Sequence, residues 1–134
     1  DAYDAAFTLP ARLAKAGVRF CISTPLDSES GAMLRNLGHH AAMAAAFGLP
    51  ADAALRSVTL DAARILGVGD RVGSIEVGKV ADLQVTDGDP LEATTRVERV
   101  LIAGTPIVME SRQTRLFKKY DARPRGPKAR PRSR

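Results

Sequence analysis

The densest group of glycines in the chain lies within residues 67–88, and it constrains the fold more than any other feature. Four glycines precede a short alternating run at residues 81–86: Gly67, Gly69, Gly73 and Gly78. Glycines this closely spaced mark turns that need positive φ or a close approach of two backbone segments. Helical patterns end just before the group, and strand patterns follow it. The sequence therefore predicts a junction between a helical region and a small sheet.

Residues 73–79 (GSIEVGK) match the opening of a phosphate-binding loop, G-x-x-x-x-G-K. That loop requires Ser or Thr after the lysine, a strand before the loop and a helix after it. Here Val80 follows Lys79, and the next residues have a strand pattern. The helix N-terminus that would hold an anion is therefore missing. We interpret the segment as a structural turn.

The residues before the glycines predict helices packed on one buried strand. Residues 18–23 are mostly apolar, as in a strand of a parallel sheet or barrel, and the polar loop at 24–31 follows that strand. Catalytic residues of a βα barrel lie in loops of this kind. We expect a short loop leading into a helix within residues 4–16, and further helices at residues 32–47, 51–58 and 62–66. Asp61 is expected to cap the last of these helices.

Three strands are expected after the glycines, at residues 81–86, 97–103 and 105–110, with a tight turn at Gly104-Thr105. Three short strands do not bury both faces of a sheet. They require partner strands, and the chain begins at Asp1 rather than at Met. We therefore expect the C-terminal portion of a longer protein. By itself, this fragment would self-associate through exposed strand edges.

Charge is divided unevenly along the chain. The net charge of the chain is +5. Residues 112–134 hold ten Lys and Arg residues and one acid, whereas the first 111 residues hold ten basic and fourteen acidic residues, a net charge of 10 − 14 = −4. Residues 114–120 predict a last helix, and the proline-rich remainder is expected to be disordered. Leu116, Phe117 and Tyr120 are expected to dock that helix. We favour a solubilising tail, since a domain that follows phosphates would carry basic residues and aromatics on a structured face.

Composition limits the possible disulfides and the classes of partner that we expect. The single cysteine, Cys21, excludes an internal disulfide and is expected to be a buried small apolar residue. The chain has no run of about 18 apolar residues, so we expect no membrane-spanning segment and no membrane partner. A nucleic-acid partner is not expected either. The alternative is a non-catalytic module whose basic tail binds an acidic partner or nucleic acid.

Several motifs in order resemble a known family. They are residues 59–67 (TLDAARILG), 71–83 (RVGSIEVGKVADL), 87–91 (DGDPL) and 96–104 (RVERVLIAG). Together they resemble the C-terminal signature of the amidohydrolase superfamily, metal-dependent hydrolases that include imidazolonepropionase, dihydroorotase and relatives of cytosine deaminase. Weaker similarity extends over residues 4–123.

The resemblance implies an α/β fold in three parts. Residues 1–66 would be the last βα part of a (β/α)₈ TIM-like barrel, and residues 67–111 would be C-terminal strands of a composite β-sandwich. Residues 112–134 would form the basic tail. Lys79 and Asp82 would then be turn and interface residues, paired between sheet and barrel, with no catalytic role.

The resemblance also implies chemistry, namely hydrolysis of a non-peptide C–N bond in an amide, cyclic amide or amidine by water activated on a divalent metal, with zinc the expected ion. A small-molecule substrate and the missing N-terminal part of the protein would be the partners. Most metal ligands would lie outside this chain, so we expect the chain alone to be inactive.

Two site residues follow from the same resemblance. The strand ending at Ser23 is similar to the family's last barrel strand, after which an Asp is usual; here Pro25 follows Thr24, and Asp27 is the nearest carboxylate. Asp27 is therefore the candidate catalytic residue and metal ligand, with a solvated turn residue as the alternative.

The adjacent residues His39 and His40 point about 100° apart on a helix and cannot hold one ion together. His40 is the candidate for substrate binding, with a helix-packing histidine as the alternative.

Overall fold

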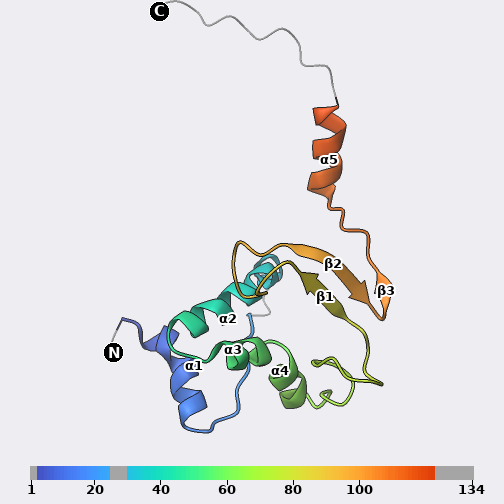
Figure 1. The fold of residues 1–134 in the computed structure, drawn as a ribbon. Helices are drawn as coiled ribbons and strands as arrows, with labels where there is room; N and C mark the ends of the chain where they lie inside the picture. The colour runs from blue at the N-terminus through green and yellow to red at the C-terminus, as the bar shows by residue number, and fades with distance from the viewer. Residues whose placement is uncertain (1–2, 25–29, 123–134) are drawn as a thin grey trace, which may run out of the picture.

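The computed structural model describes residues 3–24 and 30–122. Figure 1 shows a group of helices, a small sheet beside it and a last helix that projects away from both. The helices are α1 (Ala5–Lys15), the 3₁₀ helix η1 (Ser30–Asn36), α2 (Leu37–Ala46), α3 (Ala51–Ser57), α4 (Leu60–Ile65) and α5 (Arg112–Asp121); the strands are β1 (Leu83–Thr86), β2 (Val97–Ile102) and β3 (Thr105–Pro106).

The core of the helical region consists of small side chains. Ala41 and Ala44 of α2 are buried with Leu49 and Ala54, and Phe20 of the extended segment packs against them. Alanines let helix backbones approach closely, so α2 contacts both α1 and α3. The rings of Phe7 and Phe47 stack with their centroids 5.1 Å apart and join α1 to the end of α2.

The predicted helices are confirmed with two differences: one helix is divided, and another begins earlier than expected. The single helix expected over residues 32–47 is divided into η1 and α2. The helix after α3 begins at Leu60, so Asp61 lies in its first turn and does not cap it. The Asp61 carboxylate instead pairs with Arg56 and Arg64, each at 3.4 Å, and this attraction draws the side chain away from the helix end.

The strand predicted at residues 18–23 is not present as a strand. Residues 18–24 are extended, but they pair with no strand of the described chain. The Ile22 amide donates to the carbonyl of Ser57, at 3.1 Å, at the end of α3. A β-strand needs a neighbouring strand to share hydrogen bonds, and the described residues offer none beside this segment.

The sheet has the order β1-β2-β3, and both pairs of strands are antiparallel. The β2–β3 turn lies one residue earlier than predicted, because Ala103 (φ 48°) and Gly104 (φ 77°) both adopt positive φ, as in the type I′ turns that join tight hairpins. The Asp82 carboxylate accepts a hydrogen bond from the Ala103 amide at 2.7 Å and holds this turn against the residues before β1.

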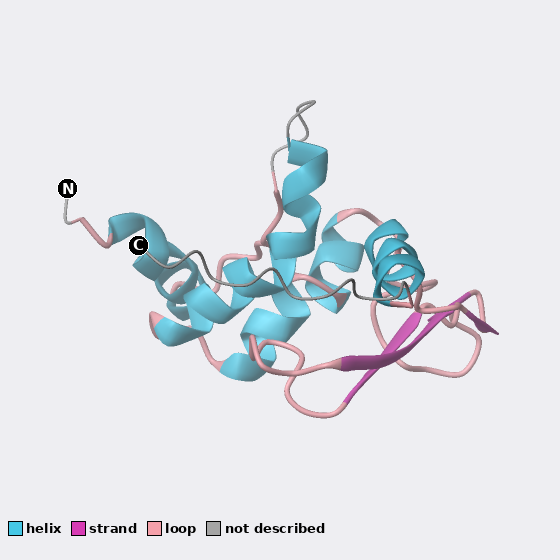
Figure 2. Ribbon diagram, turned by 90° about the horizontal axis from the view of Figure 1, so that it is seen from above, coloured by secondary structure: helices cyan, strands magenta, loops and turns pink. Residues whose placement is uncertain are grey.

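β3 is shorter than the predicted strand at residues 105–110: it ends at Pro106, and the Ile107 amide makes one further hydrogen bond to the Val100 carbonyl, at 2.9 Å. Apolar side chains of the sheet region remain exposed, among them Val85, Ile102 and Val108. Figure 2 shows the strands along one edge of the helical region. The described strands therefore do not bury both faces of this sheet, as the sequence predicts.

The glycine-rich junction is closed by a lysine. The Lys79 side chain is only 10% exposed, and its ammonium donates to the Gly69 carbonyl at 2.7 Å, the Ser74 hydroxyl at 2.6 Å and the Glu76 carboxylate at 3.1 Å. The expected pair with Asp82 is wrong, since Asp82 accepts from Ala103 instead. A lysine satisfied within its own turn is not available to a phosphate, so the structural interpretation of the G-x-x-x-x-G-K match is confirmed.

This arrangement predicts a dependence of stability on pH. The pKa of Glu76 lies below its usual 4.5, first because Ser74 donates to the carboxylate and then because Lys79 does. Since folding lowers this pKa, the carboxylate stabilises the fold above pH 4.5, and the contribution is lost as the pH falls through the folded-state value. Urea unfolding of Glu76→Gln and wild type should therefore differ at neutral pH and converge in acid.

The control for this experiment is Glu98→Gln, since Glu98 is exposed on β2. It should show no such convergence. An effect of Glu76→Gln that stays constant at every pH would contradict the prediction.

The last helix is confirmed but its docking is not. α5 begins with a capping box in which Ser111 accepts from the Thr114 amide and Thr114 accepts from the Ser111 amide. Leu116, Phe117 and Tyr120 are all exposed, so the expectation that they dock is wrong for the described chain. The predicted disorder concerns residues 123–134, which lie outside the described residues.

Candidate functional site

The candidate site lies where the extended segment 18–24 ends. Thr24 is its last described residue and is only 6% exposed, so the segment ends at a buried residue. Asp27 belongs to that range and lies outside the described residues. The chain resumes at η1 and continues directly into α2. A segment with a buried C-terminal end that precedes a helix fits the arrangement in which βα barrels carry their chemistry.

His39 and His40 both lie in the first half of α2 and both are exposed, whereas the next residue, Ala41, is fully buried. Neither histidine therefore packs in the described core. Within residues 3–24 and 30–122, neither histidine belongs to a group of three side chains that could hold a metal. Asn36, just before α2, donates its amide to the Met33 sulfur at 3.8 Å. The side chain of His40 is thus exposed in the described part of the chain.

A loop from the sheet region reaches the start of α2. A Cβ built on Gly38 would lie 4.0 Å from the Pro90 carbonyl oxygen, and Leu91 packs against the buried cluster of the helices. The Asp89 carboxylate accepts from the Leu91 amide at 2.9 Å and shapes this loop. The sequence predicts the loop as a turn only; its approach to the helix next to His40 depends on tertiary packing.

The described residues do not form a metal site by themselves. No group of three His, Cys, Asp or Glu side chains that could hold a metal occurs within residues 3–24 and 30–122. Cys21, the one cysteine of the sequence, is half-buried and not fully buried as expected.

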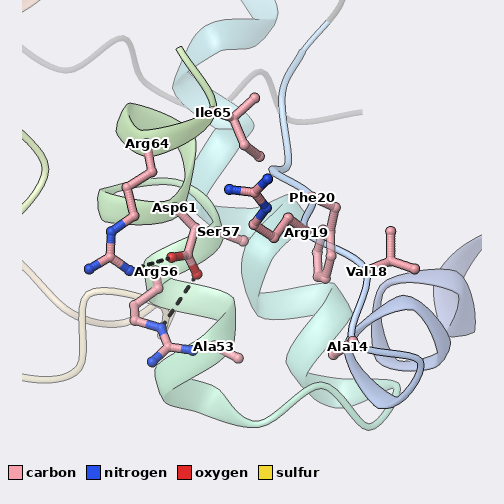
Figure 3. A pocket seen from close by; sticks show the side chains of 11 residues that line it. Ala14, Val18, Arg19, Phe20, Ala53, Arg56, Ser57, Asp61, Arg64 and Ile65 are labelled. Atoms are coloured by element: carbon pink, nitrogen blue, oxygen red, sulfur yellow. Dashed lines mark hydrogen bonds and ion pairs between the residues drawn. The ribbon is translucent and has the colours of Figure 1, made fainter. Parts of the chain in front are cut away.

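The other end of the extended segment borders a pocket of about 340 Å³, shown in Figure 3. It is lined by the end of α1 and by α3 and α4. Its charged lining residues are three arginines and one carboxylate: Arg19, Arg56, Arg64 and Asp61. Arg56 and Arg64 are half-exposed, so their ion pairs with Asp61 add little to stability. The sequence gives no signal for this pocket, because its arginines come from three separate segments.

Comparison with known proteins places most of the chain in one family. The profile of the amidohydrolase family matches residues 6–111. The imidazolonepropionase of Sphingopyxis alaskensis is 40% identical over 85 residues, which are 60% of this chain and 20% of that protein. The 5-methylthioadenosine/S-adenosylhomocysteine deaminase of Syntrophobacter fumaroxidans is 45% identical over 49 residues, 37% of this chain and 11% of that protein.

Solved structures agree with the sequence comparison. The amidohydrolase from Thermotoga maritima superposes with a TM-score of 0.65 at 35% identity, over 76% of this chain and 26% of that one. The chain thus spans about a fifth of the Sphingopyxis protein and about a quarter of the Thermotoga structure. A profile match over residues 6–111, supported by a structural match at this identity, shows the family. The chain belongs to the amidohydrolase family.

Proposed function

We propose that this chain is the C-terminal segment of a metal-dependent hydrolase that cleaves a non-peptide C–N bond of an amide, cyclic amide or amidine. The observation that carries the proposal is the family match over residues 6–111. Relatives named as an imidazolonepropionase and as a deaminase support a C–N bond as the one cleaved. The substrate is a small molecule.

The division of the chain is part of the proposal. Residues 1–66 contribute the last βα part of the barrel, residues 67–111 contribute strands to a composite β-sandwich, and residues 112–134 form the basic tail. The exposed apolar side chains of the short sheet and the unpaired edge of segment 18–24 support this division. Both features would be covered by strands from the preceding part of the same protein.

Asp27 and His40 have distinct roles in this proposal. Asp27 follows the buried end of segment 18–24, where a carboxylate can move a proton or hold a metal. His40 lies on the helix after that loop, exposed, and contacts the substrate. The remaining metal ligands belong to the preceding part of the protein, and zinc is the ion we expect.

The test uses the complete product of the reading frame that encodes this chain. We expect it to hydrolyse members of a panel of N-acyl amino acids, cyclic amides and amidines, to lose that activity after dialysis against a chelator and to regain it with zinc. The matched control is the 134-residue chain alone, which should be inactive. Hydrolysis that survives complete metal removal, or no hydrolysis of any C–N substrate by the metal-loaded protein, would contradict the proposal.

A further inference from the structure

Helix α5 stands apart from the rest of the described chain. It contacts no other described helix or strand, and in Figure 1 it projects away from the helices and the sheet. Its capping box satisfies its first amides internally, and Lys118 pairs with Glu110 at 2.9 Å. The helix is therefore stabilised by local contacts, and Leu116 and Phe117 remain exposed on it.

α5 divides its side chains between two faces. Tyr120 follows Phe117 by three residues and Leu116 by four, so the three side chains lie on one side of the helix. Leu116 is 38% exposed and Phe117 is 69% exposed. The four basic residues occupy the other side: Arg112, Arg115, Lys118 and Lys119. An exposed apolar stripe opposite a basic face is typical of helices that lie in the interface of a membrane.

The charge of the surrounding sequence indicates what covers this helix. Residues 112–134 hold ten basic residues and one acid, Asp121, and the six basic residues beyond α5 have no large apolar residue among them. This stretch attracts a strongly anionic surface, with each Lys or Arg near such a surface adding to the attraction. The partner must therefore combine dense negative charge with an apolar layer.

A lipid bilayer meets both requirements better than the other polyanions. Proteins that bind single strands of nucleic acid place aromatic rings beside the basic residues so that bases can stack, whereas Phe117 points almost opposite to Arg115 on the helix. An apolar protein groove would take the stripe but make no use of the basic residues after the helix. An anionic membrane takes both at once.

We propose that α5 binds the surface of a bilayer containing anionic lipid, with Leu116 and Phe117 inserted at the headgroup boundary and the basic residues of α5 facing the phosphates. No described helix is long and apolar enough to cross a membrane, and a helix that lies on the surface does not need to be. The absence of a spanning segment led to the expectation of no membrane partner; α5 is a different means of association. The proposal does not depend on the hydrolase function.

The test uses tryptophan fluorescence, because the chain contains no Trp. Phe117→Trp places a reporter on the apolar face of α5, and Tyr3→Trp places one at the other end of the described chain, where Tyr3 is 92% exposed. Vesicles of phosphatidylcholine with one third phosphatidylglycerol should shift the emission of the first variant to shorter wavelength and leave the second unchanged. Vesicles of phosphatidylcholine alone should shift neither.

Co-sedimentation with the same vesicles tests the apolar stripe. The double variant Leu116→Ser/Phe117→Ser should bind at least about tenfold more weakly, since two apolar side chains no longer leave water. The matched control is Ile75→Ser/Val77→Ser, which removes two exposed apolar side chains from the glycine junction and should bind as wild type does. Because α5 contacts no other described element, its variants should melt at the wild-type temperature.

Three results would overturn the proposal. The first is equal binding to the two kinds of vesicle, and the second is undiminished binding of the Leu116→Ser/Phe117→Ser variant, which would show attraction by charge alone. The third is tighter binding to a single-stranded DNA oligonucleotide than to anionic vesicles, since that would assign the basic residues to nucleic acid.

Discussion

Replacement of Gly73 by alanine should destabilise the chain by about 3 kcal/mol, through a backbone cost of about 1–2 kcal/mol and an overpacking cost of similar size. Gly73 has φ of +96°, a conformation that alanine rarely adopts. A Cβ there would lie 2.8 Å from the Ala63 Cβ and 2.9 Å from the Leu60 Cα. Both neighbours belong to α4, so the junction or the helix must move.

Gly78→Ala is the matched control, because Gly78 has nearly the same φ, +93°, and a Cβ there would meet nothing within 4 Å. It should cost only the backbone part, about 1–2 kcal/mol. Urea unfolding of the 134-residue variants measures both. Equal losses for the two substitutions would show that the close approach of Gly73 to α4 does not contribute, and would contradict the prediction.

Asp27→Asn in the complete enzyme should lower kcat about 100-fold or more, the usual loss when a group that transfers a proton is removed. The amide has the size of the carboxylate but carries no charge and accepts no proton at neutral pH. The measurement is steady-state hydrolysis of the best substrate of the panel, with metal content determined in parallel. A lower metal content would assign Asp27 a ligand role as well.

His39→Ala is the control for this substitution, because His39 is exposed on the same helix as His40 and has no role in the proposal. It should retain kcat and KM. An Asp27→Asn enzyme with wild-type kcat would identify Asp27 as a solvated turn residue, and the proton transfer would then belong to a residue outside this chain.

The sequence predicts the local features of this chain well, because they depend on residues close together. Each predicted helix is found, since apolar spacing and flanking glycines act within one or two turns. The turn between β2 and β3 is found within one residue, because Gly104 supplies one of the two positive φ values that it needs. The interpretation of residues 73–79 as a turn is confirmed as well, because it depends on the residues that directly follow Lys79.

Long-range contacts account for the differences between the sequence-based predictions and the structure. The apolar run at residues 18–23 has the composition of a strand, yet pairing needs a neighbour that the described chain lacks. Lys79 has three acceptors within its own turn, and no pattern of charges predicts that it leaves Asp82 for them. The stripe of α5 has the pattern of a docking helix, but no described surface lies beside it.

The sequence by itself determined the family, the order of the helices and of the three strands after residue 80, and the glycine-rich junction, because each of these depends on the spacing of neighbouring residues. Only the tertiary structure decided that Pro90 approaches Gly38, that Lys79 closes its own turn and that Leu116 and Phe117 remain exposed. The physical reason is that burial and hydrogen-bond partners depend on which distant segments meet, and packing settles that after the local elements have formed.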